Sequence, residues 1–265
     1  MKIKKYLVIG NPINHSLSPK LHNHWLKKNN IGATYDKIEL DDNEIKNFIQ
    51  DIKQQKIIGC NVTVPFKKTV IPYLDKLSPE AEQTQSVNTI TFNNGNLVGH
   101  NTDILGFEKA IQSLNFRVKG KKALILGAGG VVPSIIFALK KMSVSQITIS
   151  NRTRQNAENL KILFDNLNVI EWGILPETDV IINATSLGLN KETLNIDFSN
   201  LGKNKLFYDV IYNPTKTNFL NTGKKLGNIF ENGKFMFIYQ AYLAFKLWHN
   251  VEPTIDSETV KLLDR

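Results

Sequence analysis

A glycine-rich turn halfway along the chain is the first group of residues with a recognisable chemistry. In "LILGAGGVVPS" (124–134), Gly127, Gly129 and Gly130 follow an apolar run and precede a segment with helical spacing. Backbone N–H groups at such a turn, with the positive end of the helix, can hold a pyrophosphate. Val132 stands where the G-x-G-x-x-G pattern has its last glycine, so a purely structural turn stays open.

A basic segment follows the next predicted strand. A dinucleotide with a free ribose calls for an acidic residue about 20 residues beyond the glycine turn, where it accepts from the 2′-hydroxyl. This chain instead has "SNRTR", which contains Asn151, Arg152, Thr153 and Arg154. A guanidinium there can pair with a 2′-phosphate and stack on adenine, which favours NADP over NAD. The alternative is a solvated basic loop.

Polar side chains also follow the predicted strands of the first hundred residues. They are Ser16, Ser18, Thr63, Lys67, Asn88, Asn101 and Asp103. Because open parallel sheets bind ligands at the carboxyl ends of their strands, we expect these groups to form one site. Each also has an ordinary structural alternative, such as a helix cap for Ser18, turns for Asn88 and Asn101, and a surface charge for Lys67.

The elements that must position these groups alternate between strands and helices. Apolar runs predict strands at 5–10, 33–40 and 57–64. Helical segments are predicted from Ser18, as a cap before Pro19, and after "DDNE". Alternation of this kind predicts a parallel sheet. The stretch "VNTITFNNGNLVGHN" reads as a hairpin that turns at Asn-Asn-Gly.

The second half repeats the alternation. A helix is predicted at 104–115, and strands at 122–127, 146–150, 169–172, 179–185 and 206–212. An apolar helix in "KFMFIYQAYLAFKLWHN" and a short one in "SETVKLLD" follow. The fold class is therefore α/β, with a domain boundary near 103–105 and a Rossmann-like dinucleotide domain after it.

Composition limits the remaining classes. The 265 residues, 42% hydrophobic and 22% charged, predict a globular protein of two domains. The net charge of +9 comes from scattered lysines, which favours small anionic ligands over nucleic acid. The single Cys60 excludes an internal disulfide, and no histidine spacing indicates a metal site. Without a signal-peptide core or membrane span, we expect a cytoplasmic protein.

Several short motifs, in one order along nearly the whole chain, resemble the NADP-dependent shikimate dehydrogenase family. They are "NPINHSLSPKLHN", "NVTVPFK", "VNT", "GHNTDILGF", "GAGG", "NRTR", "NATSLG", "YDVIYNPTKTNFL" and "GKFMFIYQA". The resemblance implies reversible reduction of 3-dehydroshikimate to shikimate by hydride transfer, within chorismate and aromatic amino acid biosynthesis. It also implies an N-terminal α/β substrate domain (1–103 and 237–265) with a Rossmann-like NADP domain (104–236) inserted.

The resemblance also assigns roles to residues. It places Ser16, Ser18, Thr63 and Tyr212 at the substrate carboxylate, and Asn88, Asp103 and Gln240 at its ring hydroxyls. It makes Lys67 and Asp103 the catalytic pair. For the nucleotide it implies Gly127, Ala128, Gly129, Gly130 and Val131, the segment Asn151 to Arg154, and the backbone at Val210 and Gly233. The expected partners are the small-molecule substrate and at most a second copy of the chain.

The reaction needs a proton donor at the ketone oxygen. The ammonium of Lys67 can protonate that oxygen and stabilise its developing charge, with Asp103 holding the lysine. A neighbouring carboxylate favours the charged lysine, so we expect an acid and electrostatic clamp first and a base second.

Three departures from the family pattern affect these expectations. Val132 replaces a glycine of the nucleotide turn, and Gln85 and Ser86 replace Gly-Ala before Val-Asn-Thr. Phe235 stands where a glycine commonly precedes Met236, near the expected nicotinamide edge, so cofactor affinity or loop position is in question.

Three alternatives remain open. The first is a quinate or dual-specificity paralogue that uses NAD, against which "SNRTR" argues. The second is a catalytically silent regulator or nucleic-acid binder, against which the presence of both Lys67 and Asp103 argues. The third is methylenetetrahydrofolate dehydrogenase, which shares a two-domain plan but to which the two serines and "HNTD" do not point.

Overall fold

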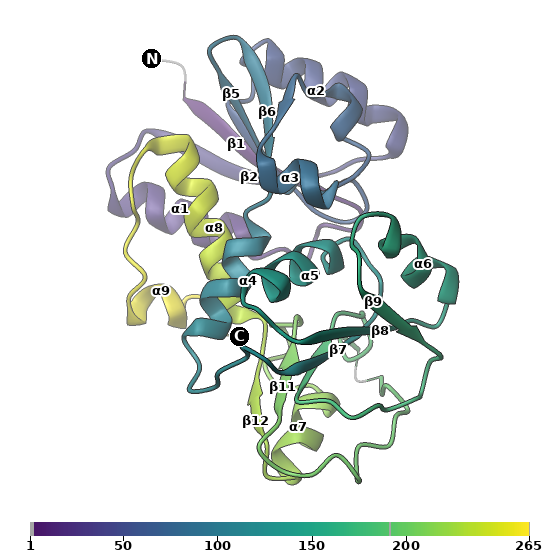
Figure 1. The fold of residues 1–265 in the computed structure, drawn as a ribbon. Coiled ribbons are helices and arrows are strands. Elements are labelled where there is room, and N and C mark those ends of the chain that lie inside the picture. The colour runs from purple at the N-terminus through teal and green to yellow at the C-terminus, as the bar shows by residue number, and fades with distance from the viewer. Residues whose placement is uncertain (1–2, 191, 265) are drawn as a thin grey trace. The chain divides into compact units, whose positions relative to one another are not determined.

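The computed structural model describes residues 3–190 and 192–264, and the chain divides into two compact units (Figure 1). The first unit comprises Met1–Gly106 and Ile238–Arg265, and the second comprises Phe107–Phe237. Both boundaries fall inside continuous helices, α4 (Asp103–Gln112) and α8 (Lys234–His249). The chain therefore passes between the units through regular structure and not through a flexible linker.

The first unit contains a mixed sheet in the order β2-β1-β3-β5-β6-β4. Its strands are β1 (Lys4–Gly10), β2 (Ala33–Glu39), β3 (Gly59–Val62), β4 (Lys76–Leu77), β5 (Thr89–Asn93) and β6 (Asn96–His100). The pairs of β1 with β2 and β3 are parallel, as predicted, whereas β5 pairs antiparallel with β3 and β6. The β5–β6 hairpin turns through Asn94 and Gly95, both with positive φ.

Two short elements of this unit were missed in the sequence. They are β4 and α3 (Pro79–Thr84), which together are only eight residues long. Neither is long enough for a hydrophobic period to stand out, although Ser78 does cap α3 by accepting from the Ala81 N–H. Strand β3 is also shorter than the predicted 57–64 and ends ahead of Pro65, which cannot donate to a ladder.

The expectation that Ser18 caps its helix was wrong. Helix α1 (Ser18–Lys28) has Leu17 at the cap position, without a side-chain cap bond. Ser18 is itself the first helical residue. The neighbouring hydroxyl of Ser16 accepts from the Ser18 N–H at 3.3 Å. Pro19 does occupy the first turn, where a missing N–H costs no hydrogen bond.

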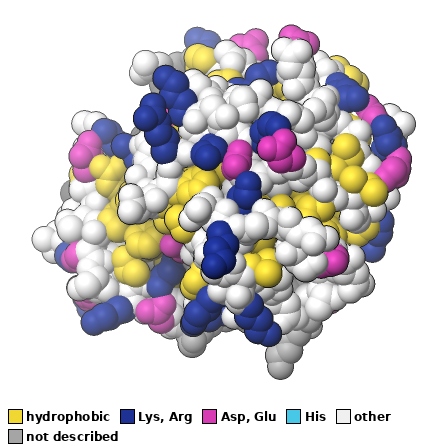
Figure 2. Space-filling view, turned by 60° about the horizontal axis from the view of Figure 1, so that its bottom comes forward, with side chains coloured by type: hydrophobic (Ala, Val, Ile, Leu, Met, Phe, Trp, Pro, Cys, Tyr) yellow, Lys and Arg dark blue, Asp and Glu magenta, His cyan; other side chains and the backbone are white. Residues whose placement is uncertain are grey.

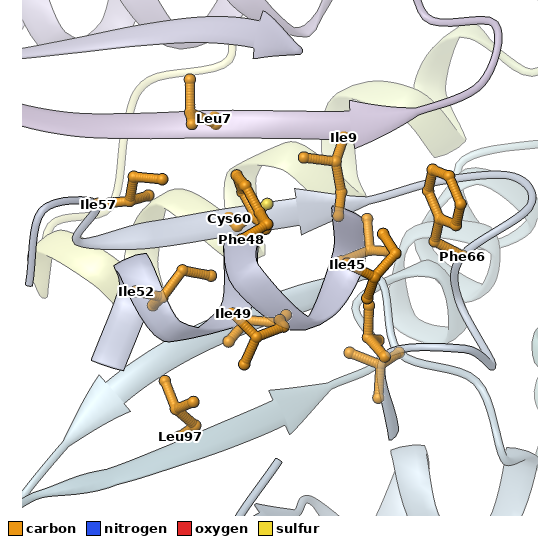
Figure 3. Close-up of a cluster of buried hydrophobic side chains, with 14 of the residues drawn as sticks. Leu7, Ile9, Ile45, Phe48, Ile49, Ile52, Ile57, Cys60, Phe66 and Leu97 are labelled. Carbon is orange, nitrogen blue, oxygen red and sulfur yellow. The ribbon is translucent and has the colours of Figure 1, made fainter. Parts of the chain in front are cut away.

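Alternating side chains of the first sheet face two different layers. Leu7, Ile9 and Cys60 point toward helix α2 (Ile45–Lys53), whose Phe48 and Ile49 pack against them in one hydrophobic cluster (Figure 3). The alternate residues of the same strands, such as Tyr6 and Gly59, face the other side of the sheet, where α1 and α8 contribute aromatic rings. There Tyr6 contacts Trp248, and Gly59 lies so close to the indole that a Cβ would be 2.3 Å from its Nε1.

The second unit contains an entirely parallel sheet in the order β12-β11-β10-β7-β8-β9. Its strands are β7 (Lys122–Leu126), β8 (Gln146–Ser150), β9 (Leu167–Ile170), β10 (Val180–Asn183), β11 (Leu206–Asp209) and β12 (Ile229–Glu231). The edge strand β12 was not predicted. The predicted α/β fold class, with two domains and a parallel sheet in the second, is confirmed.

The helices of the second unit cover the faces of this sheet. They are α5 (Val132–Lys141), α6 (Arg154–Glu158) and α7 (Asn218–Lys225). The remaining short helix, α9 (Ser257–Lys261), belongs to the first unit. Phe219 and Leu220 of α7 pack against Phe207 on one face. Val132, the departure from the glycine pattern, is fully buried at the start of α5. A valine is therefore accommodated where the helix meets the strand.

The lysines and arginines do not form a single basic stripe on the face shown in Figure 2, where they lie among neutral and acidic side chains. Across the described residues, no helix is long and apolar enough to cross a lipid bilayer.

Candidate active site

A buried ion pair lies in the first unit. Lys67, in the turn that follows β3, contacts Asp103, the first residue of α4, through its Nζ and the carboxylate Oδ2. The two side chains are only 11% and 9% exposed. In such surroundings a charge pair is screened weakly, and loss of one partner leaves the other charge uncompensated. The predicted catalytic pair is thus brought together, although its two residues lie 36 positions apart.

Two asparagines hold the backbone on which Asp103 sits. The Oδ1 of Asn88 accepts from the Thr102 N–H at 2.8 Å, and its Nδ2 donates to the Thr102 hydroxyl at 2.8 Å. Asn101 accepts from the Asp103 N–H at 3.2 Å and donates to Thr84 at 3.0 Å. Both asparagines are almost fully buried, so neither is the exposed turn residue of the structural alternative.

A chain of buried hydrogen bonds extends from Asn88 to Tyr35. Asn61 donates from Nδ2 to the Asn88 carbonyl at 3.1 Å and to the Thr89 hydroxyl at 3.0 Å. Because a backbone carbonyl only accepts, the Asn61 amide has one orientation, and its oxygen must accept from the Tyr35 hydroxyl at 2.6 Å. Burial raises the pKa of Tyr35 well above its usual value, so this hydroxyl keeps its proton.

The remaining substrate-site candidates fall at different places in the chain. Thr63 follows β3 and donates its N–H to the Ile9 carbonyl, which places it at the carboxyl end of β1. Gln240 is a partly buried residue of α8 in the first unit. Tyr212 belongs to the second unit, where its ring stacks on Phe237 with centroids 4.6 Å apart.

A cavity of about 490 Å³ opens in the second unit at the carboxyl ends of the strands. The predicted residues in its wall are Gly127, Ala128, Gly129, Asn151, Arg152 and Thr153. Gly127 has a φ of +109°, and a Cβ on it would lie 2.8 Å from the Ala184 carbonyl oxygen. Only glycine fits there. No atom lies within 4 Å of a Cβ built on Gly129, so that side of the turn is open to a ligand.

The two arginines of the basic segment differ in their partners. Arg154 is paired with Glu158, at 3.1 Å, and with Glu171. These carboxylates raise the pKa of Arg154 and neutralise its charge. Arg152 lines the cavity and has no acidic partner within 3–190 or 192–264. The free guanidinium in the cavity wall is therefore that of Arg152.

Val210 and Gly233, predicted together from the family resemblance, are in direct contact. A Cβ on Gly233 would lie 2.1 Å from the Val210 carbonyl oxygen, and the Gly233 N–H bonds to the Ile211 carbonyl at 3.1 Å. Glycine is required for this approach. Phe235, the bulky departure, is partly buried in the first turn of α8.

Several wall residues of the cavity were missed in the sequence. They are Asn156, Trp172, Ala184, Thr185, Ser186, Leu187, Thr193, Leu194 and Asn195. The segment 184–187 directly follows β10, and the rule that ligands bind beyond the carboxyl ends of parallel strands could have identified it. The same rule could have identified Trp172, which lies just beyond the end of β9, whereas the 193–195 segment follows no comparable local signal.

The histidines were the remaining residues with possible metal-binding chemistry. Among the described residues no cluster of histidine, cysteine and acidic side chains could hold a metal ion. His22, in α1, is buried and stacks on Tyr35 with ring centroids 4.1 Å apart. Neither of its ring nitrogens has a partner within the described chain, and burial lowers its pKa to about 3. A neutral core histidine fits these facts.

Two family profiles and a full-length relative match this chain. The profile described as the shikimate dehydrogenase substrate binding domain matches residues 8–90, and that of shikimate / quinate 5-dehydrogenase matches residues 108–208. The chain is 56% identical over 262 residues to a protein named shikimate dehydrogenase (NADP(+)) from Pelagibacter ubique. That alignment covers 98% of this chain and 99% of the relative.

Solved structures agree in fold. The shikimate dehydrogenase of Aquifex aeolicus superposes with a TM-score of 0.91 at 35% identity and covers 99% of this chain and 98% of its own. A Thermus thermophilus shikimate 5-dehydrogenase, solved in complex with NADP(H) and shikimate, superposes with a TM-score of 0.88 at 30% identity. It covers 98% of this chain and 97% of its own.

Proposed function

The chain belongs to the shikimate dehydrogenase family, and on this premise we propose that it catalyses the reversible, NADP-dependent reduction of 3-dehydroshikimate to shikimate. The observation that carries the proposal is the buried Lys67–Asp103 ion pair. A surface lysine would exchange its partners with water, whereas this ammonium is held at a fixed place.

Lys67 acts on the oxygen that changes from ketone to alcohol. In the reducing direction its Nζ donates a proton to that oxygen and stabilises the negative charge that develops there. Asp103 holds the ammonium in place and accepts a hydrogen bond from a ring hydroxyl. Asn88 retains a second amide proton beside the one given to Thr102, so it can also serve a ring hydroxyl.

The other substrate contacts are assigned by type. Ser16, Ser18 and Thr63 offer hydroxyl donors for a carboxylate, with Tyr212 as a fourth, and Gln240 offers an amide for a ring hydroxyl.

The residues of the second unit fit NADP. Bound NADP supplies the hydride acceptor. The glycine turn (127–130) with Val131 lies at the start of α5, where a pyrophosphate would bind, and a Cβ on Gly127 would collide with the neighbouring loop. Arg152, with Asn151 and Thr153, offers a free guanidinium to the 2′-phosphate. Val210 and Gly233, which approach each other closely, would contribute their backbone.

The two units take different parts of this reaction. We assign substrate binding to 1–103 with 237–265, and NADP binding to 104–236. We further propose that the enzyme works in the cytoplasm, as a monomer or homodimer, in chorismate and aromatic amino acid biosynthesis. Light scattering during gel filtration measures the oligomeric state directly.

The decisive experiment is formation of NADPH by the purified protein from NADP and shikimate, followed at 340 nm. Quinate in place of shikimate and NAD in place of NADP are the controls. We expect turnover with shikimate and NADP and much slower rates in both controls. A rate with quinate or NAD equal to that with shikimate and NADP would contradict the assignment, as would no turnover at all.

A paired substitution tests the cofactor assignment. Arg152→Ala removes the unpaired guanidinium, so we expect KM for NADP to rise about tenfold, which corresponds to the loss of one charge-assisted contact. Arg154→Ala removes an arginine already neutralised by two carboxylates, and KM should change about twofold or less. Equal effects of the two substitutions would show that Arg154 leaves its partners to bind the cofactor.

A further inference from the structure

A fully buried carboxylate lies in the second unit, away from the groups already assigned. Asp209 ends β11, is fully buried, and does not line the cavity. Its carboxylate accepts three hydrogen bonds from neutral donors: the Asn183 amide at 3.1 Å, the Ile211 N–H at 3.0 Å and the Thr217 hydroxyl at 2.6 Å. No lysine or arginine pairs with it within the described residues.

Asn183 connects this carboxylate to one wall of the cavity. It lies opposite Asp209 in the β10–β11 pair. Its Oδ1 accepts from the backbone and hydroxyl of Thr185, at 3.1 and 2.7 Å, and its Nδ2 donates to the Leu187 carbonyl at 3.1 Å. The segment 184–187, which forms part of the wall, is thus wrapped around the Asn183 side chain. The same segment meets the glycine turn, because the Ala184 carbonyl packs on Gly127.

The other two donors connect the carboxylate to the segment after β11. Ile211 follows Val210, whose N–H bonds to the Asn183 carbonyl at 3.0 Å and whose carbonyl contacts Gly233. Thr217 closes the segment as the cap of α7, where its hydroxyl also accepts from the Leu220 N–H at 3.3 Å. One carboxylate therefore ties down both ends of 210–217.

We propose that Asp209 is a positioning residue of the cofactor site, which holds the 184–187 wall through Asn183 and the 210–217 segment through Ile211 and Thr217. This inference rests on the proposed function, because it takes NADP as the ligand. Because the carboxylate orders the two segments before the nucleotide binds, the free energy of NADP binding is not reduced by the entropy lost in ordering them. A buried carboxylate serves this purpose because its hydrogen bonds are about twice as strong as those to a neutral acceptor.

The test compares two substitutions at one residue. Thr217→Val removes the hydroxyl that donates to Asp209 and keeps the side-chain shape, whereas Thr217→Ser keeps the hydroxyl. Calorimetric titration of each purified variant with NADP, without shikimate, gives the dissociation constant directly. We expect the dissociation constant to rise about tenfold in Thr217→Val and to stay within about twofold in Thr217→Ser.

Asp209→Asn gives a second measurement if Thr217→Val does not fold. The amide keeps the volume, but only its single oxygen can accept: the bonds from Asn183 and Ile211 become neutral and weaker, and the nitrogen at the other position cannot accept from the Thr217 hydroxyl. We therefore expect the NADP dissociation constant to rise about three- to tenfold. It also removes a buried charge, so the melting temperature should not fall at neutral pH. A purely structural role would move affinity and melting temperature together, and this variant separates them.

Asp179→Asn is the matched control. Asp179 precedes the opposite end of β10, and its carboxylate also accepts from a backbone N–H, that of Lys122, and pairs with Lys205. We expect it to leave NADP affinity unchanged. The inference is overturned if Thr217→Val and Asp209→Asn bind NADP as the unsubstituted protein does, or if Asp179→Asn weakens binding as much as they do. Failure of the unsubstituted protein to bind NADP would instead refute the proposed function.

Discussion

Asp103 and Asp209 are the same residue type in similar burial, one in each unit, but their surroundings differ. Asp103 has a lysine ammonium as its partner. Asp209 has three neutral donors, and burial outweighs these hydrogen bonds and raises its pKa to about 6. A carboxylate paired with a cation can act with it on a substrate, whereas one held by neutral donors acts on the backbone around it.

This difference extends to the elements that supply the partners. Lys67 reaches Asp103 from a turn after β3, and the asparagines behind Asp103 fix its backbone and not its carboxylate. At Asp209 the donors occupy both carboxylate oxygens. The first arrangement leaves acceptor capacity for a ligand, and the second uses it for the fold. Each prediction below tests one side of this comparison.

Lys67→Ala should have the largest effect. Loss of a donor at a developing oxyanion typically lowers kcat by about 10²–10³, and we expect a loss of that size in shikimate oxidation. NADP affinity should survive, because Lys67 belongs to the first unit. Steady-state rates together with NADP titration measure both quantities. Near-normal turnover in this variant would remove Lys67 from the mechanism.

Substitution of each aspartate by asparagine should show that the two carboxylates affect different quantities. Asp103→Asn leaves the Lys67 ammonium without a counter-charge, so we expect kcat to fall about 10²-fold at saturating substrates and the free energy of unfolding to fall by up to about 3 kcal/mol. Asp209→Asn should keep kcat within about twofold once NADP is saturating. The comparison fails if the two variants lose the same fraction of kcat.

The pH dependence of unfolding should report Asp209. Its pKa is about 6 in the folded protein against 3.8 ordinarily. Between these values the folded state holds a proton that the unfolded chain has released, so this group's contribution to stability falls as the pH rises from about 4 to 6. At about 1.4 kcal/mol for each unit of pKa, that contribution is on the order of 1–3 kcal/mol.

Chemical denaturation of the unsubstituted protein and of Asp209→Asn across this pH range measures the contribution. The variant should gain stability relative to the unsubstituted protein as the pH rises, and the difference should level off above about pH 7. Parallel curves for the two proteins would show that Asp209 stays ionised throughout.

His22 extends the comparison to a buried group without any partner. His22→Phe keeps a ring against Tyr35 and removes two nitrogens that have no hydrogen bond within the described chain. We expect the free energy of unfolding at neutral pH to rise by about 1 kcal/mol. Because the folded pKa is about 3, below the ordinary 6.5, the unsubstituted protein should lose stability as the pH falls through 6.5, and the variant should lose less. Equal acid sensitivity of both proteins would contradict this.

The local patterns sufficed for the long elements and for the motifs. The strands at 5–10, 33–40, 122–127 and 146–150 are confirmed. Those at 5–10, 122–127 and 146–150 lie inside their sheets, so their apolar residues are buried and leave a clear run, whereas the edge strand at 33–40 is fully buried at Tyr35 alone. The pairing of Lys67 with Asp103 followed from the family motifs, which the chain carries in order. Arg152 and Arg154 could not be told apart, since Glu171 lies 17 residues beyond Arg154.

What the sequence by itself determined is the fold class, the glycine turn and the residue types of the site, because each depends on neighbours within a few positions. Apart from Lys67 and Asp103, which the family motifs already paired, only the tertiary structure decided which side chains are partners. Asn183 and Asp209 are 26 residues apart and meet because parallel strands place equivalent ends side by side. Whether a buried carboxylate is reactive or structural depends on that partner, and no pattern along the chain encodes it.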